Sequence, residues 1–168
     1  MQIDNRAILY KVAEVFSLER DSTEQRLMLQ KTVYLLQAYG LKLGYGFSWY
    51  RYGPYSQDLV YDAYAVLGSE RNKYKQPADK WSFSQSCLQK FNEFKEICRD
   101  ILQSAEQLEL VASVDFLCQT WYPDAERSQM PSLLRKHKTQ FFNGQSISDD
   151  GLILRAFDIC GRLRQSSR

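Results

Sequence analysis

The sequence has no apolar run that could cross a membrane, and it has few of the residues that metal sites and disulfides use. No run approaches the roughly 18 residues that a membrane-spanning helix needs. Its only histidine is His137, and none of its four cysteines belongs to a CxxC pair. Scattered cysteines with one histidine argue against zinc, so we expect no metal and no cofactor. Cys98, Cys118 and Cys160 lie on apolar helical stripes, which is typical of reduced thiols in a cytoplasmic protein.

The chain also has little excess charge of either sign. Its net charge is +2 over 168 residues, which is too small to indicate nucleic-acid binding by itself. The distribution is less even. Residues 85–126 contain three Lys and Arg against eight Asp and Glu, whereas residues 127–168 contain eight against three. These segments either neutralise each other within the fold or give the surface two faces of opposite sign.

Motifs of the common enzyme classes are absent. The sequence contains no P-loop, GxGxxG, HExxH or GxSxG pattern. His137 lies in a basic run with no acid or nucleophile paired to it in sequence, so we interpret it as a surface residue. We therefore predict that the protein is not an enzyme. An unrecognised catalytic site, built from a carboxylate–Tyr or Lys–Tyr pair near Lys31 and Tyr50, stays open as an alternative.

Hydrophobic residues at helical spacing predict a mainly α (α+β) fold with about six helices, in a single domain over residues 1–168. The helix over 22–39 is apolar around more than half its circumference, so we expect it to be central. Residues 69–80 are expected to be a polar loop. The expected helices cover residues 5–19, 22–39, 57–68, 84–103, 105–121 and 149–164, with a short helix from Pro131 to about Lys138.

A small β element interrupts the helical pattern. Residues 45–52 are rich in aromatic side chains and alternate in polarity, which predicts one strand, part of a short hairpin. A further short strand is expected over 81–83. The pair Gly53-Pro54 is expected to break the strand, with Pro54 in a turn or a first helical turn. Ser56 is a good N-cap for the helix that follows.

Tyrosine is concentrated around this element, since nine of the eleven tyrosines lie between residues 34 and 74. They cannot all enter the core, because each buried hydroxyl needs a hydrogen-bond partner. Either they border the core and stiffen the β element, or they form an exposed surface for docking a protein, for which tyrosine offers a large area and a polar tip. The residues predicted to bind a partner are Tyr50, Arg51, Tyr52, Tyr55, Asp58 and Tyr61.

Two segments separated by Gly40 carry a resemblance to known proteins. The sequences LQKTVYLL (29–36) and WYRYGPYSQDL (49–59) resemble the YwgA-like group of small bacterial and archaeal proteins. More distantly, they are similar to the Panacea domain of SocA-like antitoxins. The resemblance covers about residues 27–67. It implies a single Panacea/YwgA-like domain that binds another protein, either as an antitoxin or as a subunit of a toxin–antitoxin or phage-defence complex.

The shared motif also has a structural interpretation. Gln30 and Lys31 form a polar pair on a mostly apolar helix, so we expect them to reach the backbone of the strand or turn. Gly53-Pro54 would form the corner between strand and helix, and Ser56 would cap that helix.

The basic C-terminal third supports a different function. Arg135, Lys136 and Lys138 form a cluster that could neutralise phosphates, so nucleic-acid binding is an alternative to protein binding. We expect no contact with a membrane.

Overall fold

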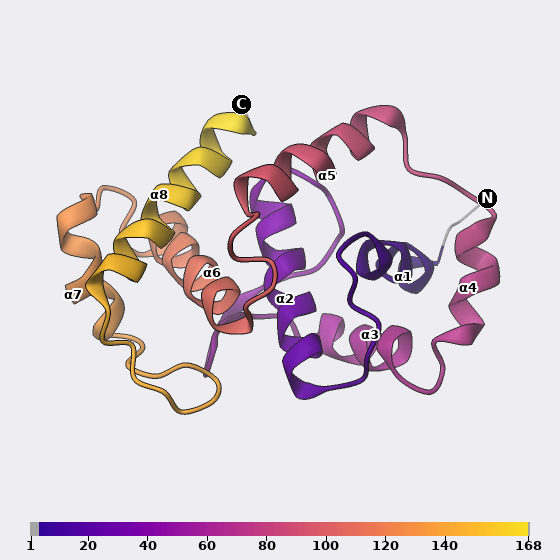
Figure 1. Ribbon diagram of the computed structural model, residues 1–168, viewed down its shortest axis with the longest axis horizontal. Helices are drawn as coiled ribbons and strands as arrows, with labels where there is room; N and C mark the ends of the chain where they lie inside the picture. The colour runs from indigo at the N-terminus through magenta and orange to yellow at the C-terminus, as the bar shows by residue number, and fades with distance from the viewer. Residues whose placement is uncertain (1–3, 168) are drawn as a thin grey trace.

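The computed structural model describes residues 4–167, and within them it contains eight α-helices and one two-stranded antiparallel sheet (Figure 1). The prediction of a mainly helical fold with a small β element is confirmed. The elements are α1 (Asn5–Val15), α2 (Thr23–Ala38), β1 (Ser48–Tyr50), β2 (Gly53–Tyr55), α3 (Gln57–Leu67), α4 (Asn72–Asp79), α5 (Gln85–Ile97), α6 (Ala105–Thr120), α7 (Met130–Arg135) and α8 (Asp150–Ser166).

Helices α2 and α6 form the centre of the structure. Every residue from Leu27 to Leu36 in α2 is buried, and so is every residue from Leu108 to Cys118 in α6. A run of several helical turns can be buried only when neighbours cover the helix on all sides. In Figure 1, α2 lies between α6, α7 and α8 on one side and α1, α3 and α4 on the other. The predicted central position of this helix is confirmed.

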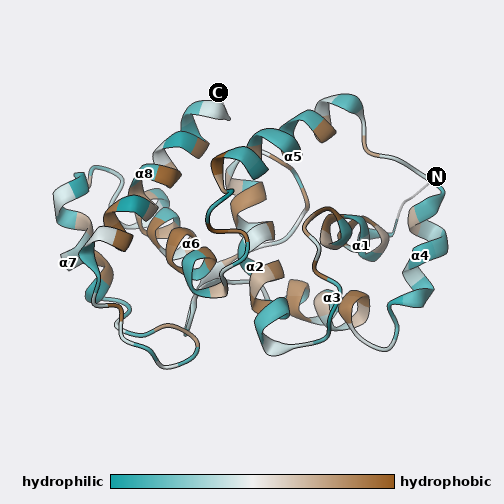
Figure 2. Cartoon of the chain, in the orientation of Figure 1, coloured by the Kyte–Doolittle hydropathy of each residue, from teal (hydrophilic) through white to brown (hydrophobic). Residues whose placement is uncertain are grey.

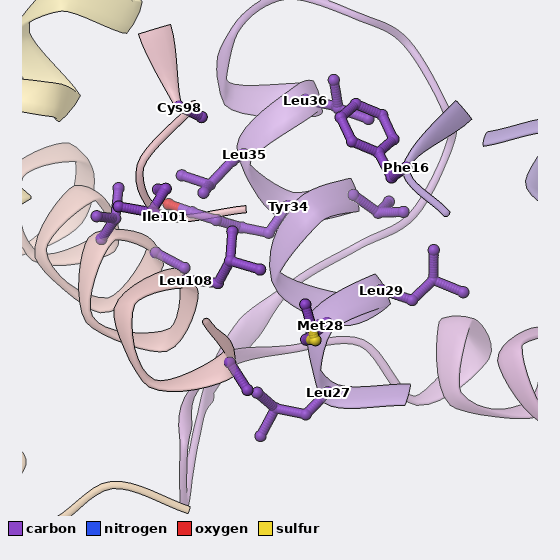
Figure 3. Close-up of a cluster of buried hydrophobic side chains, with 14 of the residues drawn as sticks. Phe16, Leu27, Met28, Leu29, Tyr34, Leu35, Leu36, Cys98, Ile101 and Leu108 are labelled. Carbon is purple, nitrogen blue, oxygen red and sulfur yellow. The ribbon is translucent and has the colours of Figure 1, made fainter. Parts of the chain in front are cut away.

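The side chains of α2 supply both halves of the core. In Figure 3, Leu35 points toward Ile101 and Leu108, whereas Leu36 lies on the opposite side beside Phe16. Figure 2 shows the complementary pattern outside, where α4 is largely hydrophilic. Because one helix contributes to the packing on both sides, residues far apart in the sequence share a continuous core.

Two expectations about residues 69–83 are wrong. Residues 72–79 form α4 instead of a loop, and its Tyr74 and Ala78, one turn apart, are buried where α4 packs against α1. Two buried residues in a polar segment are too few to produce a periodic signal. Residues 81–83 form no strand. The Phe83 ring instead packs edge-on against Phe91 of α5, with ring centroids 4.9 Å apart.

The β element is a tight hairpin rather than one strand over 45–52. Strand β1 covers only Ser48–Tyr50 and pairs with β2, in the register Ser48↔Tyr55, Trp49↔Pro54 and Tyr50↔Gly53. Gly53 and Pro54 therefore do not break a strand but belong to one. A proline is tolerated there because each strand of a two-stranded sheet is an edge strand.

Gly53 is where the hairpin meets the central helix α6. Its φ is +88°, in the left-handed region, and a Cβ atom added there would lie 2.3 Å from Ser113 Oγ. Glycine thus serves two needs at this position, a backbone conformation that side chains disfavour and a close approach of two backbones.

We expect Gly53→Ala to lower the free energy of unfolding by about 2–4 kcal/mol, because it adds a clash in a packed site to the cost of a positive φ. Chemical denaturation measures the loss. Gly44→Ala is the matched control, since Gly44 has φ +86° but nothing within 4 Å of an added Cβ. That variant should lose only about 1–2 kcal/mol. Equal losses in both variants would contradict the role assigned to the contact with Ser113.

Candidate binding site

A pocket of about 270 Å³ opens between α2, the β-hairpin and α3. Leu27, Val60 and Ala63 contribute apolar surface to it. We call it the tyrosine pocket, after the four tyrosines in its lining. Its larger lining side chains are Arg26 and Lys31 from α2, Tyr50, Tyr52 and Tyr55 from the hairpin, and Tyr64 from α3.

The walls of the tyrosine pocket are flat, solvent-exposed side chains. Tyr50 is 57% exposed and Tyr64 is 50% exposed. The rings of Tyr50 and Tyr55 pack together with centroids 5.2 Å apart. The Arg26 guanidinium lies 4.3 Å from the centroid of the Tyr64 ring and also forms an ion pair with Asp21. These aromatic side chains offer a large contact area, and they lose little conformational entropy when a ligand covers them.

The buried side of the pocket is held together by polar contacts to the backbone. Gln30 Nε2 donates to the Ser56 carbonyl at 2.7 Å, and the Ser56 amide donates back to Gln30 Oε1 at 3.1 Å. Lys31 Nζ donates to the Pro54 carbonyl at 2.7 Å. Ser56 Oγ accepts the Leu59 amide and caps α3. The expectations for these three positions, that Gln30 and Lys31 reach the backbone and that Ser56 caps the helix, are confirmed.

Lys31 belongs to a buried group of charged side chains. Lys138 forms an ion pair with Glu109, whose Oε2 also accepts the Phe142 amide at 3.1 Å. Lys31, Glu109 and Lys138 are each no more than 5% exposed. Burial lowers the pKa of Lys31 to about 7, with Glu109 opposing the shift and Lys138 adding to it. Lys31 is therefore buried near the Lys138–Glu109 ion pair but is not part of it.

The predicted partner-binding residues are only partly brought together. Tyr50, Tyr52 and Tyr55 line the tyrosine pocket, but the other three do not. Arg51 is exposed in the turn between β1 and β2. Asp58 lines a separate hollow together with Tyr50 and Tyr55, and Tyr61 is 60% exposed on α3. The two hollows therefore share the Tyr50–Tyr55 ring pair.

Three other tyrosines of the tyrosine-rich segment are buried or half-buried. Tyr34 donates to Asp115 Oδ2 at 2.8 Å, Tyr39 to Glu93 Oε2 at 2.6 Å, and Tyr45 to Asp62 Oδ2 at 2.8 Å. Each of these hydroxyls has a carboxylate partner, as a buried or half-buried hydroxyl requires. These three tyrosines therefore border the core, whereas Tyr50 and Tyr64 are exposed. Sequence reasoning did not assign Arg26 to the site, although its spacing of four residues from Gln30 places both on one face of α2.

The three basic residues proposed to bind nucleic acid are not all exposed. Lys138 is buried in its ion pair with Glu109, so its assignment as a phosphate contact is wrong. Arg135 donates to the Ile147 carbonyl at 3.0 Å and pairs with Asp150. Lys136 is exposed. Two ion pairs, Lys138–Glu109 and Arg155–Asp100, join the basic segment 127–168 to the acidic segment 85–126.

Comparisons of the chain with protein-family models, with curated proteins and with solved structures found no match. Within residues 4–167, no helix has the length and apolar character needed to cross a membrane. Among the same residues, no group of three His, Cys, Asp or Glu side chains is arranged to hold a metal ion.

The pKa of Lys31 predicts a pH-dependent stability. The amine has a pKa of 10.5 in its ordinary state and about 7 in the fold, so the unfolded chain binds more protons between these values. The contribution of Lys31 to stability therefore rises with pH over this range. Relative to Lys31→Met, the wild-type free energy of unfolding should rise by up to about 1.4 kcal/mol per pH unit.

Urea denaturation at several pH values above about 7 tests this expectation. Lys42→Met, at an exposed position in the loop after α2, is the control and should follow the wild-type profile. Parallel profiles for the wild type and Lys31→Met would show that the Lys31 amine titrates alike in the folded and unfolded states.

Proposed function

We propose that this protein is a non-enzymatic interaction module that binds a partner protein through the aromatic hairpin, the turn into α3 and the tyrosine pocket. The resemblance of residues 27–67 to the YwgA-like group and the Panacea domain supports a more specific role. That role is an antitoxin-like protein, or a subunit of a toxin–antitoxin or phage-defence complex.

The observation that carries this proposal is the clustering of exposed aromatic side chains. Among the described residues, six large hydrophobic side chains are exposed, and four of them are tyrosines of the hairpin and α3. The other two, Leu88 and Trp121, lie on α5 and just after α6. Exposed aromatic side chains gathered around a hollow are typical of the centre of a protein–protein interface.

The anchoring of the hairpin also supports the proposal. Its backbone is held by Gln30 and Lys31 from α2, and Gly53 contacts Ser113 of α6. A surface that is ordered before binding avoids part of the entropy cost of association. The face is therefore suited to binding without prior rearrangement.

One observation favours a second candidate function, the catalytic one. Lys31 and Tyr50 line the same pocket, and an amine with a lowered pKa is a better nucleophile toward carbonyl carbon. No Asp, Glu or His lines the tyrosine pocket, however, so no second acid or base is placed beside the amine. For this reason we favour binding over catalysis.

The proposal predicts that Tyr50→Ala/Tyr52→Ala weakens partner binding by at least about tenfold, because truncated aromatic hot spots each cost about 1–2 kcal/mol or more. Affinity purification identifies the partner of the wild type, and titration of the purified partner measures the loss. Leu88→Ala, which truncates an exposed hydrophobic side chain on α5, is the control and should bind as the wild type does. Wild-type affinity in a folded double variant would refute the proposed binding face.

A further inference from the structure

The lining of the tyrosine pocket carries positive charge that its own side chains do not balance. Arg26 and Lys31 line it, and no carboxylate does. The charge of Arg26 is offset by its ion pair with Asp21. Lys31 forms no ion pair with any residue in the described part of the chain. The pocket therefore has one amine, on its buried side, whose charge no ion pair balances when it is protonated.

The hydrogen bonding of Lys31 is also incomplete. An ammonium group has three N–H donors, and within residues 4–167 Lys31 uses one of them, toward the Pro54 carbonyl. Among the described residues, no hydrogen bond or ion pair joins Lys31 to Glu109, whose carboxylate binds Lys138 and the Phe142 amide. Donors that lack a partner in a buried site raise its free energy, and a ligand that accepts from them recovers that energy.

From these observations we infer that the tyrosine pocket receives an Asp or Glu side chain from the docking segment of the partner protein, and that Lys31 binds its carboxylate. This inference rests on the proposed function. An incoming carboxylate would bring the buried group to two amines and two carboxylates, and it would accept the unused donors of Lys31. A charge-assisted hydrogen bond in such a site is stronger than one at an open surface.

The surroundings of the pocket favour a peptide segment over a free small molecule. Its volume of about 270 Å³ is below the usual range of roughly 300–1,000 Å³ for ligand pockets, and suits one or two side chains. Arg51 and Tyr61 lie exposed beside it, on the turn and on α3, where a small ligand would leave them uncovered. The rings of Tyr50, Tyr52 and Tyr64 favour apolar or aromatic residues next to the acidic one.

Binding of this kind depends on pH. A carboxylate pairs with the protonated amine, and burial lowers the pKa of Lys31 to about 7. Above that pH the complex must take up a proton, so affinity falls as pH rises. The titratable groups around Lys31 are Glu109 of α6, Lys138 after α7, Arg26 of α2, and the hydroxyls of Tyr50, Tyr52, Tyr55 and Tyr64.

The test begins with a random-peptide display library selected on the immobilised full chain. We expect the selected peptides to contain Asp or Glu beside apolar or aromatic residues. Each peptide is then compared with its Glu→Gln or Asp→Asn counterpart by fluorescence polarisation. The acidic form should bind at least about tenfold more tightly to the wild type. The difference in affinity between the two forms should shrink as pH rises from about 6 to 9, because the affinity of the acidic form falls while that of the amide form changes little.

Variants assign the effect to Lys31. Lys31→Met should bind the acidic and amide peptides equally. The affinity lost when the protein and peptide substitutions are combined should therefore be smaller than the sum of the two separate losses. Lys42→Met is the control and should prefer the acidic peptide as strongly as the wild type does. If Lys31→Met fails to fold, the pair of peptides on the wild type still decides the question. N-acetylglutamate should compete only at concentrations far above those of the peptide.

The outcomes separate this inference from the proposed function. Peptides that depend on Tyr50 and Tyr52 but bind equally in acidic and amide forms would overturn the carboxylate inference and leave the binding face intact. Selected peptides that are indifferent to Tyr50→Ala/Tyr52→Ala, or no selected peptides at all, would overturn the inference together with the binding face on which it rests. Competition by N-acetylglutamate at peptide-like concentrations would show a small-molecule site and overturn the assignment to a partner segment.

Discussion

The hydrogen bonds from Gln30 and Lys31 to the backbone of residues 54–56 hold the hairpin and the proposed binding face in place. The sheet has two strands of three residues each, which is too little for independent stability. It holds its shape because a buried helix supplies a polar pair to the carbonyls and amide that the sheet leaves unpaired. The same contacts set the position of α3, since Ser56 both binds Gln30 and caps that helix.

Protein stability alone does not explain why Lys31, Glu109 and Lys138 are buried beneath the hairpin. Replacing a buried ion pair by apolar residues of similar volume is often neutral or stabilising, because removing charges from water is costly. Here two lysines and one glutamate are buried together, and one lysine reaches the lining of an open pocket. The proposed role in binding would account for Lys31, while Lys138 and Glu109 connect the centre of the fold to the segment around Phe142.

The tyrosines show how one residue type occupies both the core and the surface of this fold. Those whose hydroxyl meets a carboxylate, such as Tyr34 with Asp115, help to bury polar atoms without leaving them unpaired. Those of the hairpin and the outer face of α3 keep their rings in solvent. Composition alone does not separate the two groups, because the partner of each hydroxyl is supplied by a distant part of the chain.

Most of the helices and the cap at Ser56 could be predicted from the sequence, because periodicity and capping act over short distances along the chain. The reach of Gln30 and Lys31 to the strand or turn backbone could be predicted because polar side chains on an apolar helix need polar partners. It missed α4, which buries only Tyr74 and Ala78 in a polar segment. The burial of Lys138 against Glu109 became visible only in the folded chain, and so did the contribution of Arg26 and Tyr64 to the pocket. These arrangements depend on how the helices pack, which brings together residues that no local pattern relates.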